Sequence, residues 1–174
     1  MADRGGSVTP KKVSMHLFTG EFEHKVDQKG RVFVPKRLLT GMETEEDVTR
    51  VRFVVTLGLD GCLYLFTREG FRDHLAGLKK AAFGKPEFRA VMRGIGALSL
   101  EQNLDAQGRL LLPEGLRKRV GISKNAVVVG AIDHIEIWDA KRYEGEAAPE
   151  AEQTYLKQAE QFLDGSAMDD GDSR

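Results

Sequence analysis

The chain of 174 residues has few of the residues that cross-link or anchor a protein. Its single cysteine, Cys62, excludes an internal disulfide and is typical of a small buried side chain in a reducing cytoplasm. The longest apolar stretch, near residues 126–132, is far shorter than the roughly 20 residues of a membrane-spanning helix. The first residues contain no apolar segment of the kind found in signal peptides. With 41% hydrophobic and 30% charged residues, the composition is that of a soluble globular protein.

Motifs for catalysis and for metal binding are also missing from the sequence. The four histidines have no metal-ligand spacing with Cys62 or with a paired carboxylate. The acidic segment 43–47 lacks the regular spacing and the turn glycine of a calcium loop. We find no phosphate-binding glycine loop and no Ser/His/Asp arrangement suggested by spacing. We therefore expect no enzyme, no metal, no cofactor and no small-molecule substrate.

The formal net charge of −1 conceals an uneven distribution. Residues 144–174 carry nine acids and two bases, a net charge of −7, so residues 1–143 carry +6. A basic body with an acidic tail suits an anionic partner, although charge at this level does not identify that partner.

What the chain does contain is an internal repeat. Asp27-Gln-Lys-Gly30-Arg31 returns 78 residues later as Asp105-Ala-Gln-Gly108-Arg109, and the flanks 22–38 and 100–116 agree with it. Further along, the match continues at an offset of 72, which aligns Gly58 with Gly130, Leu63 with Ile135, Phe66 with Trp138, and Phe71 with Tyr143. We assign the six-residue difference between the two offsets to the acidic loop 41–47. The repeat indicates one structural unit used twice.

Hydrophobic patterning predicts about four strands in each unit. The first unit has expected strands at 16–26, 31–34, 51–57 and 62–66, with a short helix Lys36–Leu39 after Pro35. The second has them at 97–104, 109–112, 126–130 and 134–138, with a short helix after Pro113. Two helices are expected between the units, the first capped by Thr67. Four short strands cannot bury a core alone, so we predict a mainly β fold with accessory helices, in which both units share one closed barrel related by a pseudo-two-fold axis.

The expected organisation has five parts. They are a disordered leader over 1–14, a first half over 15–67, a helical connector over 68–96, a second half over 97–143, and an acidic tail over 144–174 that contains a helix at 150–164.

The two Asp-x-x-Gly-Arg turns are the candidate functional elements. The aspartate can accept hydrogen bonds from backbone amides, and the glycine supplies a positive φ. The arginine can either pair with that aspartate and brace the turn, or reach out to a ligand; local chemistry leaves both interpretations open. Basic residues around the turns favour nucleic acid: Lys25, Lys29, Lys36 and Arg37 near the first, and Arg117, Lys118 and Arg119 near the second. A third alternative, Asp27 and Asp105 as a catalytic carboxylate pair, requires both to be exposed in a pocket.

These residues resemble the MraZ family, bacterial transcriptional regulators built from two AbrB-like (SpoVT-AbrB) halves. The resemblance covers about 15–143 and is carried by the segments 18–35, 104–113 and 135–139. It implies a swapped-hairpin or double-split β-barrel, assembled into a ring-shaped homo-oligomer. It also implies a cytoplasmic, nucleoid-associated repressor that binds short direct repeats in promoter DNA of the division and cell-wall gene cluster, including its own promoter. Thr19 departs from the pattern, because many members have a basic residue there.

The family's DNA-contacting arginines map onto Arg31 and Arg109, with Lys29 as the matching basic residue at the first tip. We expect Arg31, and to a lesser degree Arg109, to reach guanine edges. The residues expected to hold phosphates are Lys25, Lys29, Lys36 and Arg37. Because Gln107 replaces the equivalent of Lys29, the first turn is the stronger candidate for DNA contact.

A rival hypothesis is a protein-interaction module that resembles MazE-type antitoxins and holds a partner with its acidic, partly amphipathic tail. Deletion of residues 144–174 separates the two, because a regulator would keep its DNA binding whereas an antitoxin would lose its partner.

Overall fold

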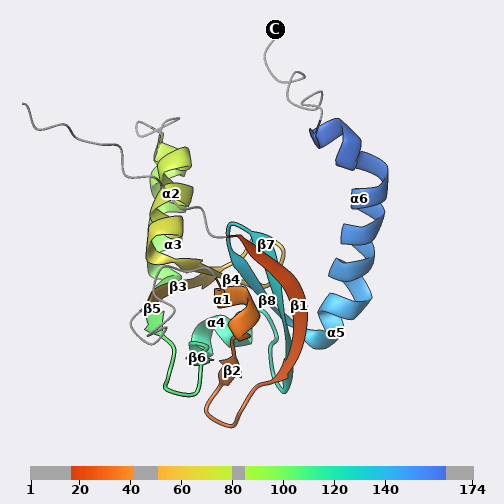
Figure 1. Ribbon diagram of the computed structural model, residues 1–174. Coiled ribbons are helices and arrows are strands. Elements are labelled where there is room, and N and C mark those ends of the chain that lie inside the picture. Colours follow the sequence, from red (N-terminus) through yellow and green to blue (C-terminus); the bar gives the residue numbers. More distant parts are fainter. Residues whose placement is uncertain (1–16, 41–50, 80–84, 164–174) are drawn as a thin grey trace, which may run out of the picture.

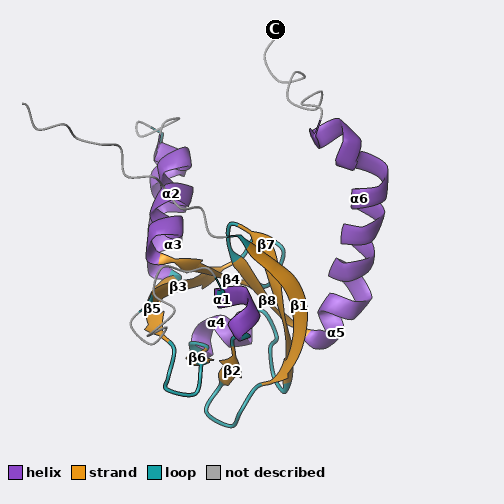
Figure 2. Cartoon of the chain, in the orientation of Figure 1, coloured by secondary structure: helices purple, strands orange, loops and turns teal. Residues whose placement is uncertain are grey.

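The computed structural model describes residues 17–40, 51–79 and 85–163 (Figures 1 and 2). The predicted leader and the acidic loop 41–47 lie outside this part of the chain. The strands are β1 (Phe18–Lys25), β2 (Arg31–Phe33), β3 (Arg52–Leu57), β4 (Leu63–Thr67), β5 (Ser99–Asn103), β6 (Arg109–Leu111), β7 (Asn125–Ile132) and β8 (Ile135–Asp139). The helices are α1 (Lys36–Leu39), α2 (Arg68–Lys79), α3 (Pro86–Ala97), α4 (Glu114–Arg119), α5 (Ala140–Arg142), a π-helical turn η2 (Tyr143–Ala147) and α6 (Ala148–Leu163).

The strands form a six-stranded antiparallel sheet, in the order β1-β7-β8-β4-β3-β5, and a separate two-stranded ribbon of β2 and β6. Exchanging each strand of the first unit for its counterpart in the second reverses the order of the sheet and leaves it otherwise unchanged. A pseudo-two-fold axis therefore passes between β4 and β8 and between β2 and β6. The predicted fold class, mainly β with accessory helices built from two repeats, is confirmed.

The two units pair with each other more than with themselves. β1 of the first unit pairs with β7 of the second, β5 of the second pairs with β3 of the first, and β2 pairs with β6. Val32 and Leu110 face each other on the axis and are both fully buried. They belong to one hydrophobic cluster with buried residues of both units, such as Phe53 and Val128. The strand exchange explains why neither four-stranded unit needs a core of its own.

The strand register corrects one part of the sequence alignment. Phe22 pairs with Val128, and its counterpart Leu100 pairs with Val55, so β3 and β7 are related by an offset of 73 rather than 72. Gly130 is therefore the counterpart of Leu57, and the predicted match of Gly58 with Gly130 is wrong. The reason is that the segment between the paired residues Leu57 and Leu63 is one residue longer than the segment between the paired residues Gly130 and Ile135. The acidic loop and its flanks account for the other five residues.

The helices that leave each closing hairpin have equivalent caps. The amide of Gly70 donates to Thr67 Oγ1 at 3.0 Å, which confirms the predicted cap of α2, and the amide of Arg142 donates to Asp139 Oδ1 at 3.3 Å. After Asp139, the chain is helical from α5 through η2 to α6, so the helix starts well before residue 150. α6 extends away from the barrel, with Tyr155 exposed (Figure 1). In the described ranges, no helix is both long enough and apolar enough to cross a membrane.

Candidate nucleic-acid interface

The two Asp-x-x-Gly-Arg turns have the same backbone structure, and we call them turn 1 (27–31) and turn 2 (105–109). In turn 1, Asp27 Oδ1 accepts hydrogen bonds from the amides of Lys29 and Arg31, both at 2.9 Å. In turn 2, Asp105 Oδ1 accepts from the amides of Gln107 at 3.0 Å and Arg109 at 2.9 Å. The glycines that close the turns, Gly30 and Gly108, have φ values of 81° and 79°, a left-handed conformation that glycine adopts without steric cost.

The arginines brace the turns and also join them. Arg31 Nε lies 2.7 Å from Asp27 Oδ2, and Arg109 Nε lies 2.9 Å from Asp105 Oδ2. Across the axis, Arg31 Nη1 is 3.5 Å from Asp105 Oδ2, and Arg109 Nη1 is 3.7 Å from Asp27 Oδ2. Two carboxylates and two guanidiniums thus form a four-charge cluster with no net charge. The bracing role that local chemistry suggested is therefore present in the structure.

The surroundings lower the pKa of both turn carboxyls. For Asp27, the largest cause is the hydrogen bond from the Arg31 amide, which lowers the pKa. Partial burial raises the pKa, and the hydrogen bond from the Arg31 side chain lowers it further. For Asp105, partial burial raises the pKa, but the amide and the side chain of Arg109 outweigh it. Both carboxylates are occupied by turn amides and guanidiniums. This geometry contradicts the alternative of a catalytic pair that is open to a pocket.

The ribbon places both arginines on one outer face. Side chains alternate between the two faces of a strand, and Val32 and Leu110 point into the core. The residues before and after them therefore face outward. In the register of the ribbon, Arg31 is paired with Leu111 and Phe33 with Arg109. The side chains of Arg31 and Arg109 remain 27% and 31% exposed despite their ion pairs.

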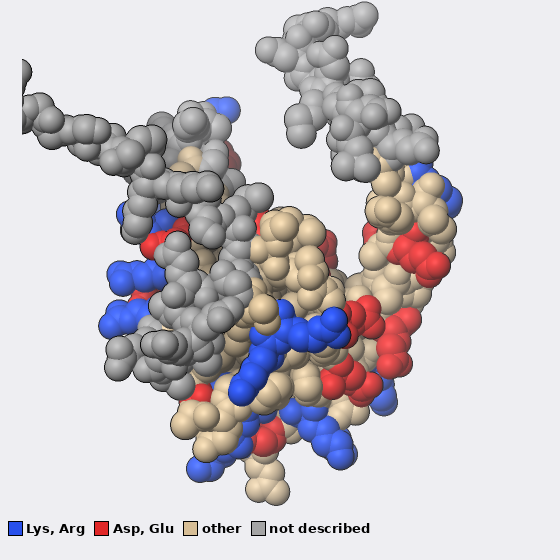
Figure 3. Space-filling model, in the orientation of Figure 1, with Lys and Arg blue, Asp and Glu red and all other residues tan. Residues whose placement is uncertain are grey.

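The other predicted contact residues lie on three elements: turn 1, the end of β1, and α1. Lys29 is exposed at the tip of turn 1, and Lys25 is exposed where β1 ends, two residues before the turn begins. Lys36 and Arg37 are exposed on α1, which lies above the two turns in Figure 1. The space-filling view shows basic side chains near α1 and at the lower end of the barrel, and acidic ones toward α5 and α6 (Figure 3). The structure thus brings Arg31 and Arg109 together, with Lys25 and Lys29 next to turn 1, whereas Lys36 and Arg37 lie on α1, above the turns in Figure 1.

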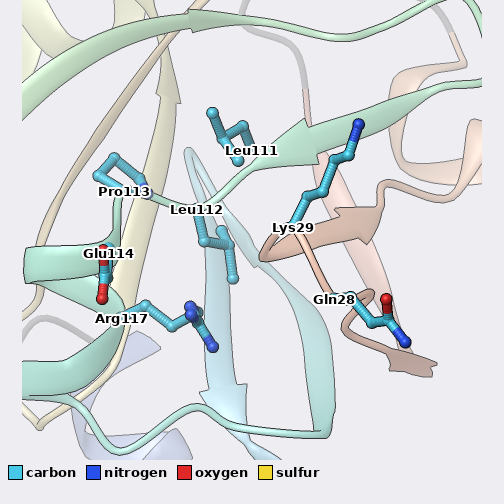
Figure 4. A pocket seen from close by; sticks show the side chains of 7 residues that line it. All are labelled: Gln28, Lys29, Leu111, Leu112, Pro113, Glu114 and Arg117. Carbon is cyan, nitrogen blue, oxygen red and sulfur yellow. The ribbon is translucent and has the colours of Figure 1, made fainter.

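A hollow beside turn 1 was missed by sequence reasoning. We call it the turn-1 hollow; its lining residues are Gln28, Lys29, Leu111, Leu112, Pro113, Glu114 and Arg117 (Figure 4). The sequence places Arg117 next to turn 2, but the structure places it against turn 1. A Cβ added to Gly30 would lie 3.2 Å from Arg117 Nε. The cause is the pairing of β2 with β6, which brings each turn close to the short helix of the other unit.

Comparison with known proteins gives a consistent family. The chain matches the family model described as "MraZ protein, putative antitoxin-like" over residues 17–94 and 98–164. A protein of Moorella thermoacetica named "Transcriptional regulator MraZ" is 35% identical over 148 residues, which is 85% of this chain and 98% of the relative. A relative of the same name from Desulforamulus reducens is 35% identical over 85% of this chain and 99% of its own length. Another, from Lachnoclostridium phytofermentans, is 38% identical over 74% of this chain and 85% of its own length.

Proposed function

The chain belongs to the MraZ family, and from that premise we propose that it is a DNA-binding transcriptional regulator. The names of its relatives support this role, and so does the arrangement at the lower end of the barrel. In finer terms, the protein represses the division and cell-wall gene cluster, including its own promoter, by binding short direct repeats. A ring-shaped homo-oligomer would present one ribbon per subunit, so successive subunits could engage successive repeats and gain affinity through avidity.

The observation that carries this proposal is the outer face of the β2–β6 ribbon. A two-stranded ribbon fits the major groove of B-DNA, where arginine can donate two hydrogen bonds to guanine and apolar side chains can contact thymine methyl groups. This ribbon offers two arginines together with Phe33 and Leu111. The turn carboxylates hold Arg31 through Nε and Arg109 through Nε and Nη2, and Arg109 Nη2 also donates to Gln107 Oε1 at 3.1 Å. Each guanidinium has five N–H donors, so donors remain for a base edge while the orientation of the group is fixed.

The cations around the ribbon supply the phosphate contacts. Lys25 and Lys29 flank turn 1, and Lys36 and Arg37 stand on the neighbouring α1. Contacts of this kind set the register of a protein on the duplex and make binding salt-dependent, but they carry no sequence information.

The test is a gel-shift titration on the gene's own upstream region and on a scrambled duplex. The wild type should prefer the upstream region, and Arg31→Ala should abolish that preference. Arg31→Lys should keep binding to both duplexes but lose most of the preference, because an ammonium lacks the planar fork of a guanidinium.

Arg72→Ala is the matched control, because Arg72 is an exposed arginine on α2, remote from the ribbon in Figure 1. Urea unfolding of each variant shows whether the barrel is intact. If a folded Arg31→Ala variant kept the full preference, Arg31 would have no reading role.

A protein partner for the tail is a second candidate function. α6 contacts η2 more than any other element and exposes 70% of Tyr155 and 75% of Leu156. Removal of residues 149–174 is the cleanest deletion, because Ala147 and Ala148 still pack against the cluster around Trp138. DNA binding that survives this deletion supports the regulator; loss of a co-purifying protein partner with unchanged DNA binding would assign the tail a separate task.

A further inference from the structure

The turn-1 hollow contains two cations that the four-charge cluster does not neutralise. We propose that it is a phosphate-binding site in which Arg117 holds a phosphate group, with Lys29, on the opposite side of the hollow in Figure 4, as the second cation. The inference deepens the proposed function and rests on it, because a DNA backbone would supply such a group. A free phosphorylated ligand has the same chemistry, and the experiment below separates the two sources.

Arg117 has unused hydrogen-bonding capacity. Its side chain extends from α4 toward turn 1 (Figure 4). Nε is enclosed against Gly30 and has no hydrogen-bond partner among the described residues, so the donors that a ligand could reach are those of Nη1 and Nη2. Nη1 makes only one long contact, 3.5 Å to the carbonyl oxygen of Ile122. A guanidinium with five donors matches the several oxygens of a phosphate, and a partly buried donor gains more from a charged acceptor than an exposed one does.

The charges around the hollow favour an anion. Arg31 and Arg109 each have a carboxylate partner, whereas neither Arg117 nor Lys29 has an ion pair within the described ranges. The one acid that lines the hollow, Glu114, forms its ion pair with Lys118, which lies outside the lining. The Lys118 ammonium is also the main cause of the lowered pKa of Glu114, and the charge of Arg117 makes a smaller contribution. The hollow therefore carries a net positive charge next to the ribbon proposed to face DNA.

The pseudo-symmetric position beside turn 2 has different chemistry. At the offset of 78, Leu39 stands in place of Arg117 and is buried, and Gln107 stands in place of Lys29. A Cβ added to Gly108 would lie 3.4 Å from the ring of Phe33, so an aromatic side chain occupies the side of turn 2 that Arg117 occupies at turn 1. The arrangement of two cations thus belongs to turn 1 and not to the duplicated turn as such.

The experiment measures the affinity of the full chain for the upstream duplex and for a scrambled duplex between about 50 and 200 mM salt. Log affinity falls as log salt rises, and Arg117→Gln should make this slope less steep by about one for each subunit engaged. Affinity should fall by the same factor for both duplexes. Lys29→Gln should act in the same direction. Arg72→Gln is the matched control, because Arg72 is an exposed arginine on α2 that does not line the hollow, and its slope should equal that of the wild type.

A second arm titrates inorganic phosphate into the protein by calorimetry, without DNA. Saturable binding that Arg117→Gln removes and Arg72→Gln keeps would assign the hollow to a free phosphorylated ligand. A changed salt slope without such binding would assign it to the DNA backbone. If neither quantity depends on Arg117 or on Lys29, the inference is overturned.

A failure of the proposed function can be distinguished from a failure of the inference about the hollow. A wild type that does not prefer its upstream region contradicts the proposed function, and the phosphate titration still reports on the hollow. A wild type that does prefer it, with an unchanged slope in Arg117→Gln, contradicts the inference alone. Urea unfolding of Arg117→Gln guards against misfolding, and Lys29→Gln, at an exposed tip, provides the same reading if Arg117→Gln does not fold.

Discussion

Turn 1 and turn 2 have the same backbone and different surroundings. In both, the aspartate accepts two amide hydrogen bonds, the glycine has a positive φ, and the arginine pairs with the aspartate. Around turn 1 lie Lys29 and Arg117, whereas around turn 2 lie Gln107, Leu39 and the ring of Phe33. The duplicated part of each turn satisfies the geometry of the barrel. The arginines proposed to read bases belong to this duplicated part, whereas the residues proposed to hold a phosphate belong to the part that has diverged.

This difference shows how one chain can use its two repeated units for different contacts. Two identical turns on a two-fold axis would present the same chemistry twice, in opposite directions. A direct repeat in DNA has one direction, so a protein that binds it gains from two halves that are not equivalent. Substitutions in the shared core, and then at the turns, test how far the equivalence of the two halves extends.

The largest effect is expected where the two units meet on the axis. Leu110→Ala removes a fully buried side chain and should lower the free energy of unfolding by about 2–5 kcal/mol. Val32→Ala, at the equivalent position, removes one carbon fewer and should cost roughly 1 kcal/mol less. Urea unfolding monitored by Trp138 fluorescence measures both. A negligible cost for either variant would mean that its unit does not contribute to the common core.

The next effect concerns a position at which the units differ. Gly130 lies so close to β1 that an added Cβ would be 2.4 Å from the backbone of Phe18 and Thr19. Its counterpart Leu57 carries a large side chain, because β5 pairs with β3 only as far as Thr56 and leaves room there. Gly130→Ala should therefore cost about 1–3 kcal/mol, since backbone cannot move aside as a flexible side chain can.

Gly96→Ala is the control for that substitution. Gly96 lies in α3 with no heavy atom within 4 Å of an added Cβ, so the same change should stabilise the protein by up to about 1 kcal/mol. If the two variants had equal stability, the close approach of β1 and β7 would not be a constraint on Gly130.

Much of the fold could be predicted from the sequence, because the repeat is marked by residues with strict backbone roles. Asp27, Gly30 and Pro35 recur as Asp105, Gly108 and Pro113, and they fix the turn and the start of the short helix in both units. The alternation of buried and exposed residues then locates the strands. Since four short strands cannot bury a core, a core shared by both units was predicted from counting them, whereas the exchange of strands was implied only by the family resemblance.

The rest depended on contacts that a linear pattern does not contain. The register of β3 against β7 is set by the length of a hairpin loop, and one extra residue made Gly58 resemble the counterpart of Gly130. The helix after Asp139 continues through Pro149, which resembled a helix start. Arg117 was placed near the wrong turn because the pairing of β2 with β6 determines which unit each short helix faces.

The smallest effect should be the same for both turns. Asp27 and Asp105 each have a lowered pKa in the folded state, so their contribution to stability is fully present above the unfolded pKa, about 3.9, and is lost as the pH falls through the lower folded pKa. Asp27→Asn and Asp105→Asn should each lower the urea midpoint at pH 7, by a similar amount, and the deficit should shrink below about pH 4. Urea titrations from pH 7 to pH 2 measure it. A deficit that did not change with pH would exclude the charged form as its source. Equal deficits for Asp27→Asn and Asp105→Asn would mean that the two turns contribute equally to the stability of the barrel. If Arg117→Gln then alters the salt slope, the two turns differ in how they bind phosphate.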